Sequence, residues 1–275
     1  MSRPTSQDFI TWANALAQFP WPIQLSDFAP YAEQLGWKPT PLPDEFSVRA
    51  GNNGGRAILG WGGSSSFTVL KNVLNRGITG TFFTEYDSRI QKAVSKLLAS
   101  ERRVFFYNSK ENALKESLAF FSGETRFFRP WENSSIDWSS IPSVILEPPL
   151  PWTKDIFILA VKTESPKDFQ KIDSGIKINA PMQAAVSRSI YNLIKEIQVR
   201  KESDWFLYDT VLNAYFERKG PYLYPKIPKE MYDAAIVHFL DSGIVISPDF
   251  SNPSIVPFGA DLGVFSKLKK NPFKY

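Results

Sequence analysis

Apolar residues recur along this chain at two spacings, and each spacing predicts its own kind of element. Steps of three and four, typical of helices with one buried face, run through residues 5–19, 64–74, 87–98, 109–121, 181–197, 204–217 and 229–241. Short apolar runs bounded by turn-forming residues, typical of strands, occupy residues 104–107, 125–128, 143–146, 156–161, 244–247 and 254–257. The alternation of the two kinds predicts an α/β fold in the middle of the chain and an α+β arrangement towards its C-terminal end.

One strand candidate is apolar throughout. Residues 156–161 read IFILAV, without a polar residue. A run of this kind is typical of a strand buried on both faces of a parallel sheet, so we expect a parallel strand here.

The glycine-rich segment around residue 54 predicts a hairpin. Two runs, 45–50 and 56–61, flank Asn53-Gly54, the usual signature of a tight turn between paired strands. Neither GxGxxG nor Walker spacing occurs among the neighbouring glycines, which favours a hairpin over a phosphate-binding loop.

The stretch RVFFYNSKENALKESLAFF, residues 103–121, joins a strand directly to a helix. The β-rich run ends at Asn108-Ser109, and a helical pattern starts at once. Both residues are good helix N-caps, so we expect free N–H groups of the helix at the carboxyl end of the strand. An α/β sheet commonly holds an anion at such a place, which predicts a small-molecule anion as a ligand.

Composition and charge narrow the class of protein. The 275 residues are 43% hydrophobic, enough for a sizeable core. The net charge is +4, and Lys and Arg are scattered apart from a short basic tail at Lys267, Lys269, Lys270 and Lys274. A nucleic-acid binder is expected to cluster its cations, so we expect no nucleic-acid partner.

Two residue types limit the chemistry. The absence of cysteine excludes disulfides, thiolate catalysis and Cys-ligated metals. The single histidine, His238, lies inside a helical pattern, which argues against Ser-His-Asp and His-metal sites, and we expect no metal. No apolar run reaches the length of a membrane span and the first residues have no apolar signal core, so we expect a cytoplasmic protein without a membrane partner.

Several stretches resemble, in order, the class III aminotransferases, the fold-type I PLP-dependent family that includes glutamate-1-semialdehyde aminomutase. Residues 77–98, GITGTFFTEYDSRIQKAVSKLL, resemble the family's glycine-rich loop, acidic position and helix. The central VFFYNSKENALKESLAFF looks like its VxFxNSGTEAxxxALxxAR motif. SVILEPPLPW is similar to a later strand ending in Glu-Pro, and NAPMQAAVSRSIYNLIKEI to the first helix of its small domain. Each motif is short, but their order covers most of the chain.

The resemblance implies a particular architecture. It predicts an N-terminal helix and hairpin arm over residues 1–63 and a reduced PLP-transferase-like large domain with a mainly parallel sheet over residues 64–178. A small α+β C-terminal domain would follow over residues 179–275. Family members are dimers, so the resemblance also implies a homodimer.

The chain departs from the family at the phosphate-binding turn. Members follow Asn-Ser with Gly-Thr, which contact the PLP phosphate, whereas this chain has Lys110 and Glu111. Glycine lets a backbone approach an anion closely, and a carboxylate at a helix N-terminus repels one. The residual phosphate cradle implied by the resemblance is Asn108, Ser109, Lys110, Glu111 and Asn112.

A second departure concerns the Schiff-base lysine. The segment between residues 152 and 181 is shorter than the region in which members carry their pyridinium-binding Asp and their lysine. Ala160 stands where the acid is expected, and Lys162, which follows the strand directly, is the remaining candidate for the lysine. A catalytic lysine needs desolvation or a neighbouring cation, and the local sequence indicates neither.

These departures predict a truncated aminotransferase-like protein that is catalytically inactive, binds no cofactor, and has a structural or ligand-binding role. The alternative is a PLP-dependent aminotransferase or aminomutase acting on a small amino compound, with Lys162 as the Schiff-base lysine. A third reading is a macromolecular binder that uses the basic tail and exposed aromatic side chains.

Overall fold

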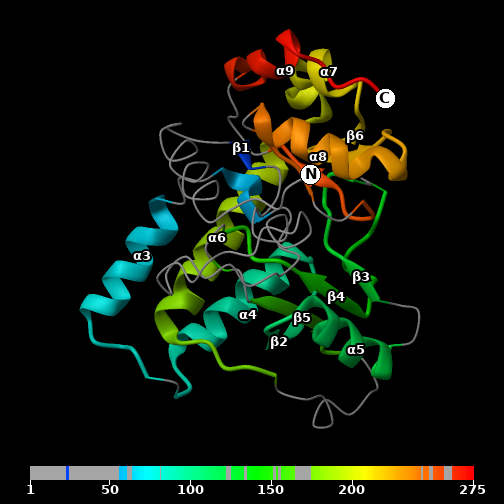
Figure 1. Cartoon of the computed structure of the whole chain (residues 1–275). Helices are drawn as coiled ribbons and strands as arrows, with labels where there is room; N and C mark the ends of the chain where they lie inside the picture. Colours follow the sequence, from blue (N-terminus) through cyan, green and yellow to red (C-terminus); the bar gives the residue numbers. More distant parts are fainter. Residues whose placement is uncertain are drawn as a thin grey trace, which may run out of the picture. The chain divides into compact units, whose positions relative to one another are not determined.

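The computed structural model describes residues 23–24, 56–60, 64–80, 82–121, 125–132, 135–150, 153, 156–164, 175–242, 244–247, 250–256 and 262–275. The chain divides into two compact units (Figure 1). The first, called the sheet unit here, is Trp61–Arg200; the second comprises Met1–Gly60 and Lys201–Tyr275.

The predicted N-terminal helix over residues 5–19 lies outside the described residues, as does the first strand of the predicted hairpin. The prediction of a second hairpin strand at residues 56–61 is wrong. Residues Arg56–Leu59 form a short 3-10 helix, η2, with Arg56 and Ile58 buried. The sequence RAIL has three of the strongest helix formers in four positions, which explains this outcome.

The sheet unit is built on four strands in the order β2-β5-β4-β3. Their bounds are Arg102–Tyr107 for β2, Thr125–Phe127 for β3, Ser143–Leu146 for β4 and Phe157–Lys162 for β5. Strand β5 is antiparallel to both neighbours, and only the short pair β3 and β4 is parallel. The sheet is therefore mixed, and the prediction of a mainly parallel sheet with residues 156–161 as a parallel strand is wrong.

The connection between β4 and β5 explains this difference. Only residues 147–156 separate the two strands, and a parallel return requires a crossover of a dozen residues or more. The apolar run of β5 reflects burial on both faces of the sheet. Ile158 and Ala160 face one hydrophobic cluster, whereas Phe157, Leu159 and Val161 face the other.

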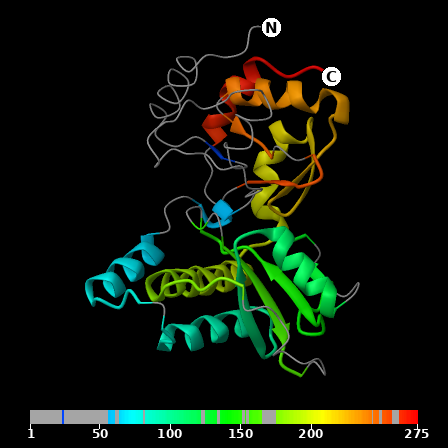
Figure 2. The same cartoon turned by 60° about the horizontal axis from the view of Figure 1, so that its bottom comes forward.

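Helices cover both faces of this sheet (Figure 2). Helices α4 (Glu85–Leu97) and α6 (Ala180–Val199) pack on one face, and α5 (Lys110–Phe120) packs on the opposite face. Helix α3 (Ser64–Asn75) packs against α6. The predicted C-terminal domain began at residue 179, whereas α6 packs with α3 and α4 inside the sheet unit.

Local capping chemistry sets the starts of two of these helices. Thr84 is the N-cap of α4, and Asp87 accepts the Thr84 N–H at 2.6 Å, so the two residues form a capping box. Asn179 caps α6 by accepting the Met182 N–H at 3.0 Å, and Pro181 stands in the first turn, where proline is favoured.

An additional strand segment lies at the open edge of β2. Gly175 forms a parallel bridge with Phe106, and the Ile176 N–H donates to the Phe106 carbonyl at 2.8 Å. Gly175 has a φ of +62, and a Cβ at this position would overlap the Phe106 carbonyl oxygen. This position therefore requires glycine.

The second unit contains short helices and two small sheets. Its elements after residue 200 are η4 (Glu202–Trp205), α7 (Phe206–Leu212), β6 (Phe216–Lys219), β7 (Tyr222–Pro225), η5 (Lys229–Met231), α8 (Tyr232–Asp241), β8 (Ile244–Val245), β9 (Ser254–Ile255), η6 (Leu262–Phe265) and α9 (Ser266–Lys270). Strands β6, β7 and β9 form an antiparallel sheet, and β1 (Ile23–Gln24) pairs in parallel with β8.

The helix predicted over residues 204–217 ends early, at Leu212. Phe216 instead starts β6, which turns at Gly220-Pro221 into β7 with Lys219 opposite Tyr222. Gly220 has a φ of +57, which a two-residue hairpin turn needs and glycine supplies without strain.

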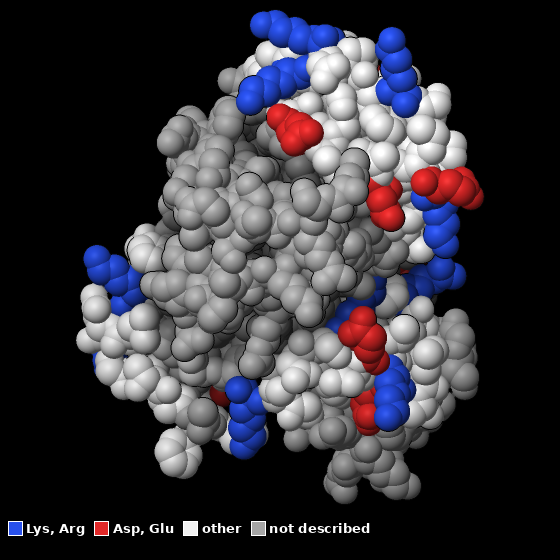
Figure 3. All heavy atoms as spheres, in the orientation of Figure 1, with Lys and Arg blue, Asp and Glu red and all other residues white. Residues whose placement is uncertain are grey.

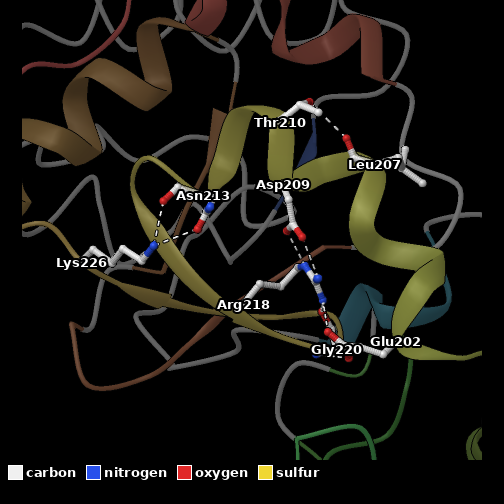
Figure 4. Close-up of polar contacts among 8 residues, drawn as sticks. All are labelled: Glu202, Leu207, Asp209, Thr210, Asn213, Arg218, Gly220 and Lys226. Atoms are coloured by element: carbon white, nitrogen blue, oxygen red, sulfur yellow. Dashed lines mark hydrogen bonds and ion pairs between the residues drawn. The ribbon is translucent and has the colours of Figure 1, made fainter.

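Arg218 holds this hairpin against the preceding helices (Figure 4). Its guanidinium donates to both Asp209 carboxylate oxygens, at 2.6 and 2.9 Å, and also to Glu202 and the Gly220 carbonyl. Glu202 in turn accepts the Gly220 N–H at 2.9 Å. The hydrogen bonds that Arg218 donates to Asp209 are the main reason that the pKa of Arg218 is raised, so this cation stays charged.

Candidate functional site

The turn between β2 and α5 contains the five residues of the predicted phosphate cradle. Ser109 is the N-cap of α5: its backbone is extended, and its hydroxyl accepts the Asn112 N–H at 3.1 Å. The Asn112 side-chain amide donates to Asn108 Oδ1 at 3.1 Å. The Ser109 hydroxyl and one N–H of the first turn are therefore used within the helix cap.

The two substituted residues of the turn take their own positions. Lys110 Nζ lies 4.3 Å from the centroid of the Phe127 ring on β3, a cation–π contact. Glu111 is exposed in the first helical turn. Its carboxylate interacts favourably with the helix N-terminus and occupies the electrostatic role that a bound anion would have.

These residues do not fit the PLP phosphate. A phosphate at this turn would meet the Glu111 carboxylate, and the ammonium group of Lys110 already lies over Phe127. The Ser109 hydroxyl accepts a backbone N–H as the helix cap and has only its own proton, one neutral donor, to offer an anion. What remains at the surface is a neutral pair of amides, Asn108 and Asn112, rather than a charged clamp.

Lys162 lies at the other end of the sheet. Strand β5 is antiparallel to β2, with Lys162 opposite Arg102 and Phe157 opposite Tyr107. Five strand residues therefore separate Lys162 from the turn at Asn108, and the six steps between the two positions correspond to roughly 20 Å along the strand. The structure brings residues 108–112 together but does not bring Lys162 to them.

The surroundings of Lys162 are those of a surface ion pair. Its Nζ lies 3.2 Å from Glu164, whose side chain is 81% exposed. Nearby, hydrogen bonds from Ser139 and, to a smaller extent, the charge of Lys162 lower the pKa of Asp137. Such contacts keep a lysine solvated instead of supplying the desolvation that an amine nucleophile requires.

Next to Lys162, Arg102 is fully buried and structural. Its guanidinium donates to the Ile141 carbonyl at 2.6 Å, the Trp138 carbonyl at 2.8 Å and the Ser100 hydroxyl at 2.8 Å. Burial lowers its pKa to about 10. The side chain ties residues 138–142 to the start of β2.

The only histidine has a structural contact as well. His238 Nε2 is 2.7 Å from the Asn271 carbonyl, and its ring lies against Phe273. Within the described ranges, no group of His, Asp and Glu could hold a metal ion, and no helix is long and apolar enough to cross a membrane.

The structure also gathers cations that are scattered along the sequence. Exposed side chains at matching helical spacing line α4 (Arg89, Lys92, Lys96) and α6 (Arg188, Tyr191, Lys195). The helices run in the same direction, because Gln183 binds Asp87 near their starts and Lys96 Nζ lies 5.7 Å from the Tyr191 ring farther along. This α4–α6 basic face was missed because its residues are about a hundred positions apart; the repeated spacing in the two helices was the available signal.

Comparison with known proteins gives relatives and a fold. No family model matches the chain. An uncharacterized protein of Borreliella burgdorferi is 26% identical over 226 residues, covering 79% of this chain and 80% of the relative. An uncharacterized protein of Treponema pallidum is 21% identical over 266 residues, covering 74% and 81%.

Among solved structures, the chain is similar to acetylornithine aminotransferase from Elizabethkingia anophelis. The TM-score is 0.52 at 8% sequence identity, and the alignment covers 97% of both chains. At that identity the likeness concerns the fold alone. The chain therefore has an aminotransferase-like α/β fold, which confirms at this coarse level the resemblance indicated by the sequence motifs.

Proposed function

We propose that this protein is a non-catalytic protein built on an aminotransferase-like fold, with a structural or ligand-binding role. The observation that supports this best is the separation of the two candidate halves of a PLP site. Lys162 and the turn at Asn108 lie at opposite ends of β2, roughly 20 Å apart along the strand. One small cofactor with its phosphate at the turn cannot also reach the lysine.

The chemistry of the turn supports the same proposal. Ser109 caps its helix, Lys110 contacts Phe127 and Glu111 places a negative charge where the phosphate would bind. PLP supplies its reactivity only when a protein holds and orients it, and these residues do neither. A retained ligand at this turn would be small and weakly charged, bound by the amides of Asn108 and Asn112.

An absorption experiment with PLP tests the proposal. Purified protein is incubated with PLP, dialysed and scanned, and any lysine adduct is reduced and located by mass spectrometry. We expect no stoichiometric visible band, with only scattered labelling of exposed lysines. A one-to-one band that is lost in Lys162→Ala and kept in the surface control Lys195→Ala would refute the proposal.

We further propose that the protein is a homodimer, as the aminotransferase-like fold implies. Sedimentation at micromolar concentration is the measurement, and a pure monomer would refute this part without bearing on catalysis.

The α4–α6 basic face supports a second candidate function, the binding of a polyanion such as nucleic acid. Five exposed cations, of which Arg89 also pairs with Glu85 at 2.9 Å, stand on this face with Tyr191, which is a recognised footprint for phosphate contacts. Retention on immobilised DNA should then fall steeply with salt. The double variant Lys92→Glu/Lys96→Glu should abolish retention and the tail variant Lys269→Glu/Lys270→Glu should not; salt-independent retention would exclude this function.

A further inference from the structure

The sheet unit exposes an unusual group of large apolar side chains. Phe82 and Phe83, adjacent in the loop between α3 and α4, are 87% and 86% exposed. On α3, Phe67 is 58% and Leu74 46% exposed. We call these four residues the Phe82 surface. Scattered apolar residues on a surface are ordinary, but two neighbouring phenylalanines of this exposure call for an explanation.

The members of the Phe82 surface belong to one end and one side of the helical layer. Phe67 and Leu74 are seven positions apart on α3 and therefore lie on the same helical face. Val73, next to Leu74, packs with Ala180 at the start of α6. Lys177, three residues before α6, lies 5.5 Å from the Phe83 ring. Leu74 and Phe83 thus both lie at the end of the layer where α6 begins.

The loop that carries the two phenylalanines is anchored on its C-terminal side. Thr84, directly after Phe83, caps α4 and exchanges hydrogen bonds with Asp87, which also accepts the Gln183 amide at 2.8 Å. Tyr86, two residues after Thr84, is buried, and Arg76 donates to its hydroxyl at 3.4 Å. The inward-facing positions of this segment are therefore already filled, and Phe82 and Phe83 face solvent.

We infer that the Phe82 surface is the contact through which a second copy of this chain binds. The inference rests on the homodimer of the proposed function and assigns its location. A complete aromatic side chain supplies about 150–250 Å² of burial, so the exposed fractions of the four residues correspond to roughly 500 Å² on each copy. Two copies would bury roughly 1,000 Å² of apolar surface, most of what a specific interface of about 1,200–2,000 Å² requires.

The charges around the Phe82 surface suit a self-complementary contact. Cations stand on its margins at Lys71, Arg76 and Lys177, and the surface over α3 shows blue Lys and Arg atoms among white ones (Figure 3). Glu85, whose side chain is half exposed and pairs with Arg89 at 2.9 Å, stands directly beside it at the start of α4. In a twofold contact each copy offers this Glu85–Arg89 pair as well as cations, so both signs of charge are present at the margin.

Sedimentation of matched variants tests the assignment. The double variant Phe82→Ser/Phe83→Ser should raise the dimer dissociation constant by about 100-fold or more, because two aromatic anchors are lost together. Leu118→Ser is the control: Leu118 is 44% exposed on α5, on the opposite face of the sheet. Far-UV circular dichroism spectra should stay near that of the unchanged protein, since all three side chains are exposed in the single chain. The urea midpoint of the double variant should fall only by the stabilisation that dimer formation supplies.

Cysteine cross-linking gives a second, independent measurement, because the chain has no cysteine of its own. Under mild oxidation, Phe83→Cys should form a disulfide-linked dimer and Lys115→Cys on α5 should not. A dimer that survives the double serine variant and fails to cross-link through residue 83 would overturn the assignment, as would a monomeric unchanged protein. Binding of anionic vesicles by that monomer would identify lipid as the partner instead. The PLP experiment is unaffected by any of these outcomes, so failure of this inference is separable from failure of the non-catalytic proposal.

Discussion

Removing the Asp209 carboxylate should destabilise the second unit measurably. Asp209 holds the Arg218 guanidinium through two hydrogen bonds, and the Arg218 side chain is only 7% exposed. In Asp209→Ala the cation would keep Glu202 and the Gly220 carbonyl but lose the carboxylate that accepts two of its hydrogen bonds. The hairpin between β6 and β7 would then be tied to α7 by fewer contacts (Figure 4).

The magnitude follows from the exposure of the two partners. Breaking a fully buried ion pair costs about 3–5 kcal/mol, whereas an exposed pair contributes about 0–1 kcal/mol. Arg218 is buried, but the Asp209 side chain is 36% exposed and water can replace part of its contact. We therefore expect Asp209→Ala to lower the free energy of unfolding by about 2–3 kcal/mol, and Asp209→Asn, which keeps one acceptor, by about half of that.

Urea unfolding followed by circular dichroism measures this difference, with Glu217→Ala as the control. Glu217 lies in the same hairpin and pairs with Lys219 at 3.5 Å, but both side chains are about half exposed or more. Its removal should cost less than about 1 kcal/mol. If Asp209→Ala lowers the free energy of unfolding no more than Glu217→Ala does, the contacts of Arg218 with Asp209 do not stabilise the hairpin.

Three further predictions concern other buried contacts. Gly175→Ala should destabilise the sheet unit by about 3 kcal/mol or more in urea unfolding, since its backbone has positive φ and a Cβ would overlap the Phe106 carbonyl; a neutral result would contradict that geometry. Arg102→Met should cost about 3 kcal/mol or more, since it leaves carbonyls of residues 138–142 buried without their donor; an equal or higher urea midpoint would show that desolvation of the cation outweighs its hydrogen bonds. Burial raises the pKa of Tyr215, so the folded protein holds this phenolic proton more tightly than the unfolded chain; its contribution to stability is complete below about pH 10 and is lost as the pH rises through the folded value. Titration of phenolate absorbance in the unchanged protein and Tyr215→Phe checks this, and a difference spectrum that titrates at or below the ordinary tyrosine pKa would contradict it.

The elements that depend on local chemistry were predictable from the sequence. Strand β4 occupies the predicted residues 143–146, and α6 starts within a residue of the predicted Pro181 because Asn179 and Pro181 are a cap and a first-turn residue. The cap at Ser109 was predicted for the same reason, since the strand and helix it joins are contiguous. Periodicity and capping involve residues a few positions apart, and such signals survive in any tertiary context.

Predictions that depended on pairing between distant segments were wrong or incomplete. The apolar run at residues 156–161 indicated burial correctly, but its direction in the sheet is set by the ten-residue return from β4. The antiparallel direction of β5 also places Lys162 far from Asn108. In the sequence the two look alike, because Asn108 directly follows one strand and Lys162 ends another. Strand β6 was missed because its first two residues, Phe216 and Glu217, fall in the helical pattern over residues 204–217 and the strand alternates over only four residues.

By itself, then, the sequence determined the kinds of elements, their caps, the absence of thiol chemistry and the altered Asn-Ser-Lys-Glu turn, since each is a property of neighbouring residues. Only the tertiary structure decided which distant groups meet. It separated Lys162 from the turn, gathered the cations of α4 and α6 on one face, and left Phe82 and Phe83 in solvent while burying Tyr86 beside them. Strand direction and helix packing arise from contacts between segments far apart in the chain, and these contacts leave no periodic signal in a single sequence.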